Sequence, residues 1–92
     1  MKFIWDSEKS KINLSKHNIS FDEAKTVFSD PFARVVFDTE HSVDEERFII
    51  LGLSALLKIL IVCYCHREND TIRIISARKA DKKEQRDYVR LK

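Results

Sequence analysis

Residues Ile72–Ala80, with the sequence IRIISARKA, decide the fold of this chain. The segment begins with β-branched apolar residues, which are typical of a buried strand. It ends in the basic pair Arg78-Lys79, which we expect to open a charged helix over 80–91. A strand that leaves the sheet through two cations places positive charge at the sheet edge, where a phosphate group can bind. The stretch therefore predicts the fourth strand of a sheet, at 71–77, with an anion site at its exit.

The residues before this stretch predict three further strands, at 33–37, 47–53 and 58–66. Their connections are short and polar, which favours antiparallel pairing. The third of these strands is apolar on both faces, which is typical of a central strand. The turn Glu68-Asn69-Asp70 then leads into the opening stretch.

Two short helices are expected before the strands, at 7–17 and from Ser20 to the residues before Asp30-Pro31. Asp6 or Ser7 can cap the first helix, and Asn18 is a plausible left-handed stop. Ser20 and Glu23 have the spacing of a capping box, in which each side chain bonds the backbone amide of the other residue. Phe3-Ile4-Trp5 is a short strand or an extended lead, with Trp5 expected in the core. The sequence thus predicts one α+β domain over 1–92, with two N-terminal helices, a four-stranded mainly antiparallel sheet and a C-terminal helix.

The charge of the chain is unevenly distributed, although its net value is only +2. Residues 38–47 hold five acidic residues and one arginine, whereas residues 78–92 hold seven basic residues and three acidic ones. This asymmetry indicates one surface for an anion and another for a different partner, or simply two solvated surfaces.

Several classes of protein are not expected from this sequence. The polar N-terminus lacks the apolar core of a signal peptide, and the longest apolar run, 59–65, is far shorter than a membrane span. We expect a cytoplasmic protein that does not bind membranes. Cys63 and Cys65 are expected to be reduced core residues on one strand face, because neighbouring cysteines on one face do not bridge easily. No Cys/His spacing resembles a zinc site, so no metal or cofactor is expected.

The chain resembles the BrnT family of toxins from bacterial type II toxin–antitoxin systems. The matching elements run in order through nearly the whole chain. They are Trp5-Asp6-x-x-Lys9-x-x-x-Asn13-x-x-Lys16-His17, Phe21-x-x-Ala24-x-x-x-Phe28-x-Asp30-Pro31, Asp44-Glu45-Glu46-Arg47, Gly52-Leu53-Ser54, Arg67, Ile72–Ala80 and Glu84-x-x-x-Tyr88. Three positions depart from the family pattern: Asn18 stands in place of a glycine, the turn Ala55-Leu56-Leu57 lacks one, and Gln85 replaces an arginine.

The resemblance implies a RelE-like fold and a ribonuclease that cleaves RNA and inhibits translation. It also implies a cognate BrnA-type antitoxin and binding of operator DNA only as the toxin–antitoxin complex. Two other hypotheses remain open. The chain can be a non-catalytic module that binds nucleic acid or a protein partner, or an inactive relative that kept the fold and the partner.

Metal-independent cleavage of RNA needs a proton acceptor, a proton donor and groups that stabilise charge on the phosphorane. Arg78 and Lys79 match basic residues that the family associates with toxicity, and we expect both to bind phosphate and stabilise the transition state. Without the resemblance, they are interpreted as a solvated helix start with a salt bridge. Arg67 matches a family arginine in the same role, and is otherwise a turn cation.

His66 and His17 are the candidate proton carriers near neutral pH. Glu84 is a further catalytic candidate. We also expect contacts with RNA from Arg73, Lys82 and Tyr88 on the fourth strand and last helix. Two of these have alternatives: Arg73 can pair with an acid such as Glu46, and Tyr88 can stack a base or pack the last helix on the sheet.

Overall fold

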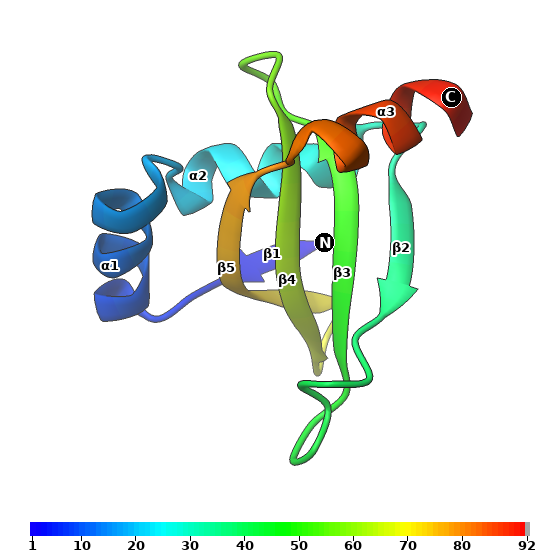
Figure 1. Cartoon of the computed structure of the whole chain (residues 1–92). Coiled ribbons are helices and arrows are strands. Elements are labelled where there is room, and N and C mark those ends of the chain that lie inside the picture. The colour runs from blue at the N-terminus through cyan, green and yellow to red at the C-terminus, as the bar shows by residue number, and fades with distance from the viewer. Residues whose placement is uncertain (92) are drawn as a thin grey trace.

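The computed structural model describes residues 1–91 as a five-stranded sheet with three α-helices and one 3-10 helix (Figure 1). In chain order the elements are β1 (Lys2–Ile4), α1 (Ser7–His17), α2 (Phe21–Ala24), the 3-10 helix η1 (Lys25–Ser29), β2 (Arg34–Phe37), β3 (Arg47–Leu53), β4 (Ile59–Arg67), β5 (Thr71–Lys79) and α3 (Lys82–Leu91). The strand order is β1-β5-β4-β3-β2. The α+β class is confirmed, and β4 is the central strand as expected.

The expectation of four strands was wrong, because β1 adds a fifth strand at the edge of the sheet. It pairs in parallel with the start of β5, with Lys2 opposite Thr71 and Ile4 opposite Arg73. All the other strand pairs are antiparallel. Three residues are too few to show an alternating pattern, and the partner of β1 lies about 70 positions away in the sequence. The sheet is therefore mixed.

The second predicted helix is α-helical over a shorter range than expected. The α2 helix ends at Ala24 and the chain continues as the 3-10 helix η1. The Thr26 hydroxyl donates a 2.6 Å hydrogen bond to the carbonyl oxygen of Glu23. Such side-chain bonds to the preceding turn compete with regular α-helical bonding. The following residues continue as a tighter 3-10 turn and end at Asp30, before Pro31.

The caps of the first two helices largely follow the prediction. Asp6 accepts hydrogen bonds from the amides of Glu8 and Lys9 at 2.8 and 3.1 Å, and Asn18 closes α1 with a left-handed φ of 59°. The Lys9 and Glu8 amides lower the pKa of Asp6. Ser20 caps α2 by accepting from the Glu23 amide at 3.0 Å.

The other half of the predicted capping box is wrong, because the Glu23 side chain turns into the protein. Its carboxylate accepts a 2.7 Å hydrogen bond from the hydroxyl of Ser54 and lies 3.5 Å from the ammonium group of Lys58. Ser54 and Lys58 flank the β3–β4 turn, in which Leu57 occupies a left-handed φ of 65°. The buried carboxylate thus holds both sides of this hairpin, whose turn contains no glycine.

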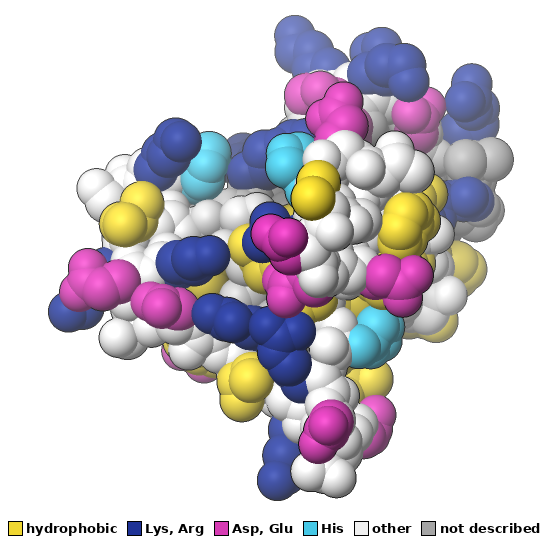
Figure 2. Space-filling model, turned by 90° about the horizontal axis from the view of Figure 1, so that it is seen from below, with side chains coloured by type: hydrophobic (Ala, Val, Ile, Leu, Met, Phe, Trp, Pro, Cys, Tyr) yellow, Lys and Arg dark blue, Asp and Glu magenta, His cyan; other side chains and the backbone are white. Residues whose placement is uncertain are grey.

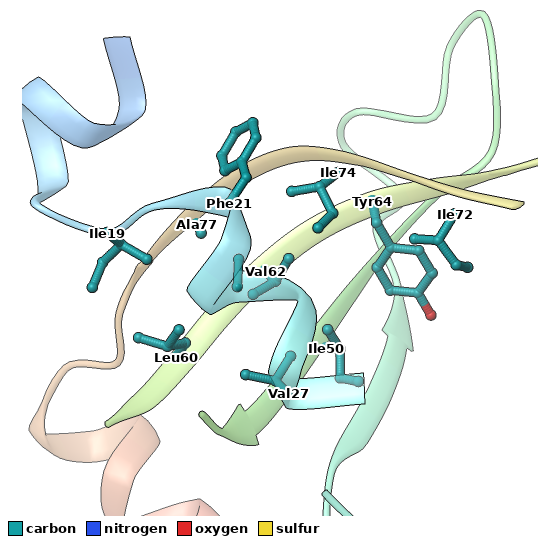
Figure 3. Packing of buried hydrophobic residues seen from close by; sticks show 11 residues of the cluster. Ile19, Phe21, Val27, Ile50, Leu60, Val62, Tyr64, Ile72, Ile74 and Ala77 are labelled. Carbon is teal, nitrogen blue, oxygen red and sulfur yellow. The ribbon is translucent and has the colours of Figure 1, made fainter. Parts of the chain in front are cut away.

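The hydrophobic core lies between the sheet and the segment formed by α2 and η1. Figure 3 shows Phe21 and Val27 of this segment clustered with the strand residues Leu60, Val62 and Ile74. All five side chains are buried. Trp5 packs at the margin of this core against Phe21, with a ring-centroid distance of 5.9 Å. We call this side of the sheet the core face.

At Gly52, β3 lies close to η1. A Cβ atom at this position would lie 3.2 Å from the Cβ atoms of Val27 and Ala33, and 3.3 Å from the Val27 carbonyl oxygen. These distances are shorter than ordinary van der Waals contact. A larger residue at Gly52 therefore needs Val27 and Ala33 to move by a few tenths of an ångström.

A β-bulge interrupts the pairing of β5 with β4. Cys63 pairs with Ser76 but the next residue, Tyr64, pairs with Ile74, so Ile75 has no partner. Bulges bend and twist the strand that carries them. Figure 1 shows β5 turning sharply along its length. The bulge shifts the side-chain alternation by one, so Arg73 before it and Arg78 after it lie on the same face.

Two further expectations concern the membrane and the cysteines. None of the helices within residues 1–91 is long and apolar enough to cross a membrane. Cys63 and Cys65 are free thiols, of which Cys65 is buried.

Candidate functional site

The arginines of the strands all lie on the face of the sheet opposite the core face, which we call the open face. Each is adjacent in its strand to a residue of the core face, and side chains alternate along a strand. The five residues are Arg34, Arg47, Arg67, Arg73 and Arg78. Among the described helices, only α3 crosses this side, at the upper end of the sheet (Figure 1). Only three of these five arginines, at positions 67, 73 and 78, were predicted as site residues.

The register arranges these arginines in rows across the sheet. Arg34 and Arg78 end one row, with Leu51 and Ile61 between them. A second row contains Arg47, Cys65 and Arg73. The row between the two is mostly apolar and consists of Val36, Ile49, Cys63 and Ser76. The open face therefore has an apolar middle with arginine on both sides, a combination that suits stacking of bases and binding of backbone phosphates.

Arg78 is held by a two-armed ion pair with Glu84 of α3. Its Nη1 and Nη2 atoms donate to the two carboxylate oxygens of Glu84 at 2.8 and 2.9 Å. The Arg78 bond lowers the pKa of Glu84, and the same bond raises the pKa of Arg78. Both side chains stay partly exposed, so the remaining donors of the guanidinium can reach a ligand.

Glu84 is itself fixed by the start of α3. Its carboxylate accepts from the Asp81 amide at 2.8 Å, and the Asp81 carboxylate accepts from the Glu84 amide at 2.8 Å. This reciprocal pair is a capping box. The Arg78 guanidinium is thereby attached to the first turn of a helix, although Arg78 itself belongs to β5 and does not open the helix as the sequence suggested.

A second ion-pair cluster lies at the other end of the open face, around Glu45. The Glu45 carboxylate accepts from Arg67 at 3.0 Å and lies 3.4 Å from Nε of Arg47. The Arg67 bond is the main cause of the lowered pKa of Glu45. Arg67 also lies 3.1 Å from the Cys65 sulfur, and burial raises the pKa of that thiol. Figure 2 shows this lower end of the molecule, where basic and acidic side chains are interspersed.

The structure does not bring Arg67 and Arg78 together. Arg78 is opposite Ile61 in β4, six residues before Arg67. Six residues of a strand span about 20 Å. One phosphate group cannot contact both side chains, so the two predicted catalytic arginines lie at opposite ends of the open face.

Three other predicted residues lie away from Arg78. His66 is on the core face, where its ring packs against Phe48 and Tyr64 at centroid distances of 5.3 and 5.6 Å. Lys79 is exposed and points to the core face, because it follows Arg78 directly in the strand. Lys82 is exposed on α3, about 200° around the helix from Glu84.

Tyr88 takes the second of its two predicted roles and packs α3 onto the fold. Its side chain is buried, and its hydroxyl donates a 2.6 Å hydrogen bond to Asp30. Burial and this bond raise the pKa of Tyr88 to about 12. The same carboxylate oxygen of Asp30 accepts from the amide of Leu53 at 2.8 Å. Tyr88 and Asp30 therefore anchor the helix that carries Glu84, and the buried ring is not presented to a base.

Arg73 is half-buried and forms no ion pair with any residue of the described chain, so the alternative pair with Glu46 is absent. Sequence reasoning missed Arg34 and Arg47, although their alternation with apolar neighbours is visible in the sequence. No group of three or more potential metal ligands occurs among residues 1–91.

Comparisons with known proteins agree with the resemblance seen in the sequence. The family model described as "Ribonuclease toxin, BrnT, of type II toxin-antitoxin system" matches residues 5–84. The fold is similar to the crystal structure of the Brucella abortus ribonuclease toxin BrnT, with a TM-score of 0.69 and 27% sequence identity over 89% of this chain and 99% of that chain. No curated protein sequence matches this chain significantly.

Proposed function

The chain belongs to the BrnT family of ribonuclease toxins of type II toxin–antitoxin systems, and we propose that its open face binds the RNA, with Arg78 at the point of cleavage. The observation that carries this assignment is the two-armed Arg78–Glu84 pair. It fixes a guanidinium on an exposed sheet face that is lined by four more arginines. A preorganised cation of this kind stabilises charge that develops in a transition state.

In the proposed reaction, the ribose 2′-hydroxyl gives its proton to solvent as its oxygen bonds to the adjacent phosphorus. The bond from phosphorus to the 5′-oxygen of the next nucleotide breaks, the leaving oxygen takes a proton from solvent, and a 2′,3′-cyclic phosphate remains. Arg78 donates hydrogen bonds to the phosphorane oxygens through the N–H groups that Glu84 leaves free, and supplies charge that a metal ion provides in other nucleases. Arg78 cannot act as the base, because its guanidinium stays protonated. Glu84 acts as a positioning residue for Arg78, since its lowered pKa keeps it ionised.

The remaining arginines of the open face hold the strand on either side of the cleaved bond. In this proposal, Arg73 and Arg67 contact phosphates toward the lower end of the open face. Lys79 lies on the core face and Lys82 on the side of α3 away from Glu84, so neither contacts the RNA. Isoleucine and valine side chains of the middle row provide apolar surface for bases. The spacing of about 20 Å between Arg67 and Arg78 fits contacts with several successive nucleotides.

The family membership implies an antitoxin partner. We propose that this partner is a BrnA-type protein and that operator DNA is bound only by the complex, in the cytoplasm. The small net charge of +2 supports this view, because non-specific affinity for DNA comes mainly from contacts with phosphates.

The test of the proposed function compares Arg78→Ala with Arg86→Ala. Arg86 is an exposed cation on α3, about 200° around the helix from Glu84, and serves as the matched control. The unmodified chain and the Arg86 variant are expected to arrest growth on induction and to cleave purified RNA, whereas the Arg78 variant does neither. A folded Arg78→Ala protein with full toxicity and cleavage would contradict the proposal.

A further inference from the structure

A small cavity lies between α1 and the bulge of β5, and the proposed cleavage site does not use it. Its volume is about 180 Å³. The residues that line it are Lys9, Ile12, Asn13, Lys16, His17, Ile75 and Ser76. Three of the seven, Lys9, Lys16 and His17, are basic residues, and none is acidic. The cavity is therefore an electropositive hollow on the helix that carries Lys9-x-x-x-Asn13-x-x-Lys16-His17.

The helical repeat brings these basic groups to the cavity. Lys9 and Lys16 are seven residues apart and lie about 20° apart around α1, with Asn13 between them on the buried side. Lys11 is rotated by about 200° from Lys9 and does not line the cavity. Figure 2 shows basic side chains and a histidine along the α1 side of the molecule.

The cations at this cavity differ from the arginines of the ion-pair clusters. Arg78 and Arg67 are paired with Glu84 and Glu45. Lys9, Lys16 and His17 form no ion pair with any residue among 1–91. Of the three, Lys9 has a weak electrostatic interaction with Asp6, whose pKa is lowered mainly by the Lys9 and Glu8 amides and in smaller part by the Arg73 and Lys9 side chains. An anion that enters the cavity displaces no carboxylate.

Ser76 connects the cavity to the open face. It is exposed, lines the cavity and stands in the middle row beside Cys63. It lies two residues from Arg78 on the same face, which is a distance of about 7 Å along the strand. An extended nucleic-acid strand held at Arg78 can therefore place a neighbouring phosphate at Ser76 and the α1 cations.

From these contacts we infer that the cavity formed by Lys9, Lys16, His17 and Ser76 binds a second backbone phosphate of the RNA strand that is cleaved at Arg78. The inference rests on the proposed function and adds the path of the RNA strand over the protein, from α3 across β5 to α1. The lysines supply charge, and the Ser76 hydroxyl supplies a directed hydrogen bond. The bulge at Ile75 leaves Ser76 facing the cavity.

The test uses a fluorescent single-stranded RNA whose 2′-hydroxyls are methylated, so that it binds without being cleaved. Binding is measured by anisotropy over a range of salt concentrations for Lys9→Gln/Lys16→Gln and for the control Lys11→Gln/Lys25→Gln. The first variant is expected to bind about 5- to 10-fold more weakly at low salt. Its plot of log affinity against log salt is expected to be less steep by about 0.7 for each phosphate that the variant no longer neutralises. The control is expected to match the unmodified chain.

A cleavage assay separates this inference from the proposed function. Lys9→Gln/Lys16→Gln should cleave a dinucleotide at the unmodified rate and a long RNA with a raised KM. If the unmodified chain binds and cleaves RNA but the two double variants behave alike, the cavity inference is overturned and the proposed function stands. If the unmodified chain neither binds nor cleaves RNA, both are overturned. If the first variant loses only antitoxin binding, the cavity belongs to the protein partner and the inference is wrong.

Discussion

The side-chain amide of Asn13 pairs with the backbone of Ala77 as a neighbouring strand would. Its Nδ2 atom donates to the Ala77 carbonyl oxygen at 2.9 Å, and its Oδ1 atom accepts from the Ala77 amide at 3.0 Å. β1 pairs with β5 only as far as Arg73, so the outer edge of β5 beyond that point has no strand beside it. A third bond, from Nδ2 to the Ile19 carbonyl oxygen at 2.9 Å, connects the same amide to the start of α2.

Asn13→Ala is expected to destabilise the protein by about 2–4 kcal/mol, because it removes three buried hydrogen bonds and leaves the Ala77 amide unsatisfied. Urea denaturation followed by circular dichroism measures this change in the free energy of unfolding. Ser15→Ala, at an exposed position of the same helix, should change stability by less than about 0.5 kcal/mol. Equal stability of the two variants would show that the amide of Asn13 is dispensable.

Gly52→Ala is expected to cost about 1–3 kcal/mol, because the added methyl group forces β3 away from η1. The comparison is thermal unfolding of this variant and of Gly52→Ala/Ala33→Gly. The double variant removes one of the two Cβ atoms 3.2 Å from the new methyl group and should recover part of the stability. No change on Gly52→Ala alone would contradict the close approach of β3 and η1.

Tyr88→Phe keeps the buried ring but removes the hydrogen bond to Asp30, so it is expected to cost about 1.5–3 kcal/mol, as for a bond to a charged group. The folded pKa of Tyr88 is raised from 10.0 to about 12. This contribution is therefore present below pH 10 and is lost as the pH rises toward 12. Ultraviolet titration of tyrosinate should show Tyr88 ionising near pH 12 in the folded protein, and ionisation near pH 10 would refute the buried bond.

Glu84→Gln is expected to weaken the hold on Arg78 and to change the response of stability to acid. The folded pKa of Glu84 lies below the ordinary value of 4.5, so its contribution is present above pH 4.5 and is lost as the pH falls through the lowered pKa. Stability of the unmodified chain should fall more steeply below pH 4.5 than that of Glu84→Gln. Glu68→Gln, at an exposed position without an ion pair among residues 1–91, should keep the original slope. Parallel slopes for Glu84→Gln and the unmodified chain would argue against the ion pair.

Features with a local signal were predicted well. The β3 strand and helix α1 have the expected bounds, since alternating apolar residues and the Asp6 and Asn18 caps act within a few positions. Features that depend on distant contacts were missed. Nothing near β1 indicates its pairing with β5, and nothing near Glu23 indicates that its carboxylate binds Ser54, 31 residues later.

The residues of the candidate site were likewise predicted where the signal is local and missed where it depends on distant contacts. The sequence identified Arg78 and Glu84 but placed Arg78 at the start of a helix, because it has no signal for a strand that continues through two cations. The sequence prediction grouped His66 and Arg67 with Arg78, because all three lie near the end of a strand. The sequence does not tell at which end of the sheet, or on which of its faces, each side chain lies. The two additional arginines, Arg34 and Arg47, join the site only through the register of β2 and β3.

The unpaired residue Ile75 determines which side chains of β5 lie on each face of the sheet. If Ile75 instead paired with Cys63 in a regular register, every side chain after it would exchange faces relative to those before it. If the first half of β5 kept its place, Arg78 would turn toward the core face and Lys79 would take its position opposite Glu84. A point charge would then replace a planar fork. One inserted residue thus selects which of two neighbouring cations faces the open side, without changing the identity of either.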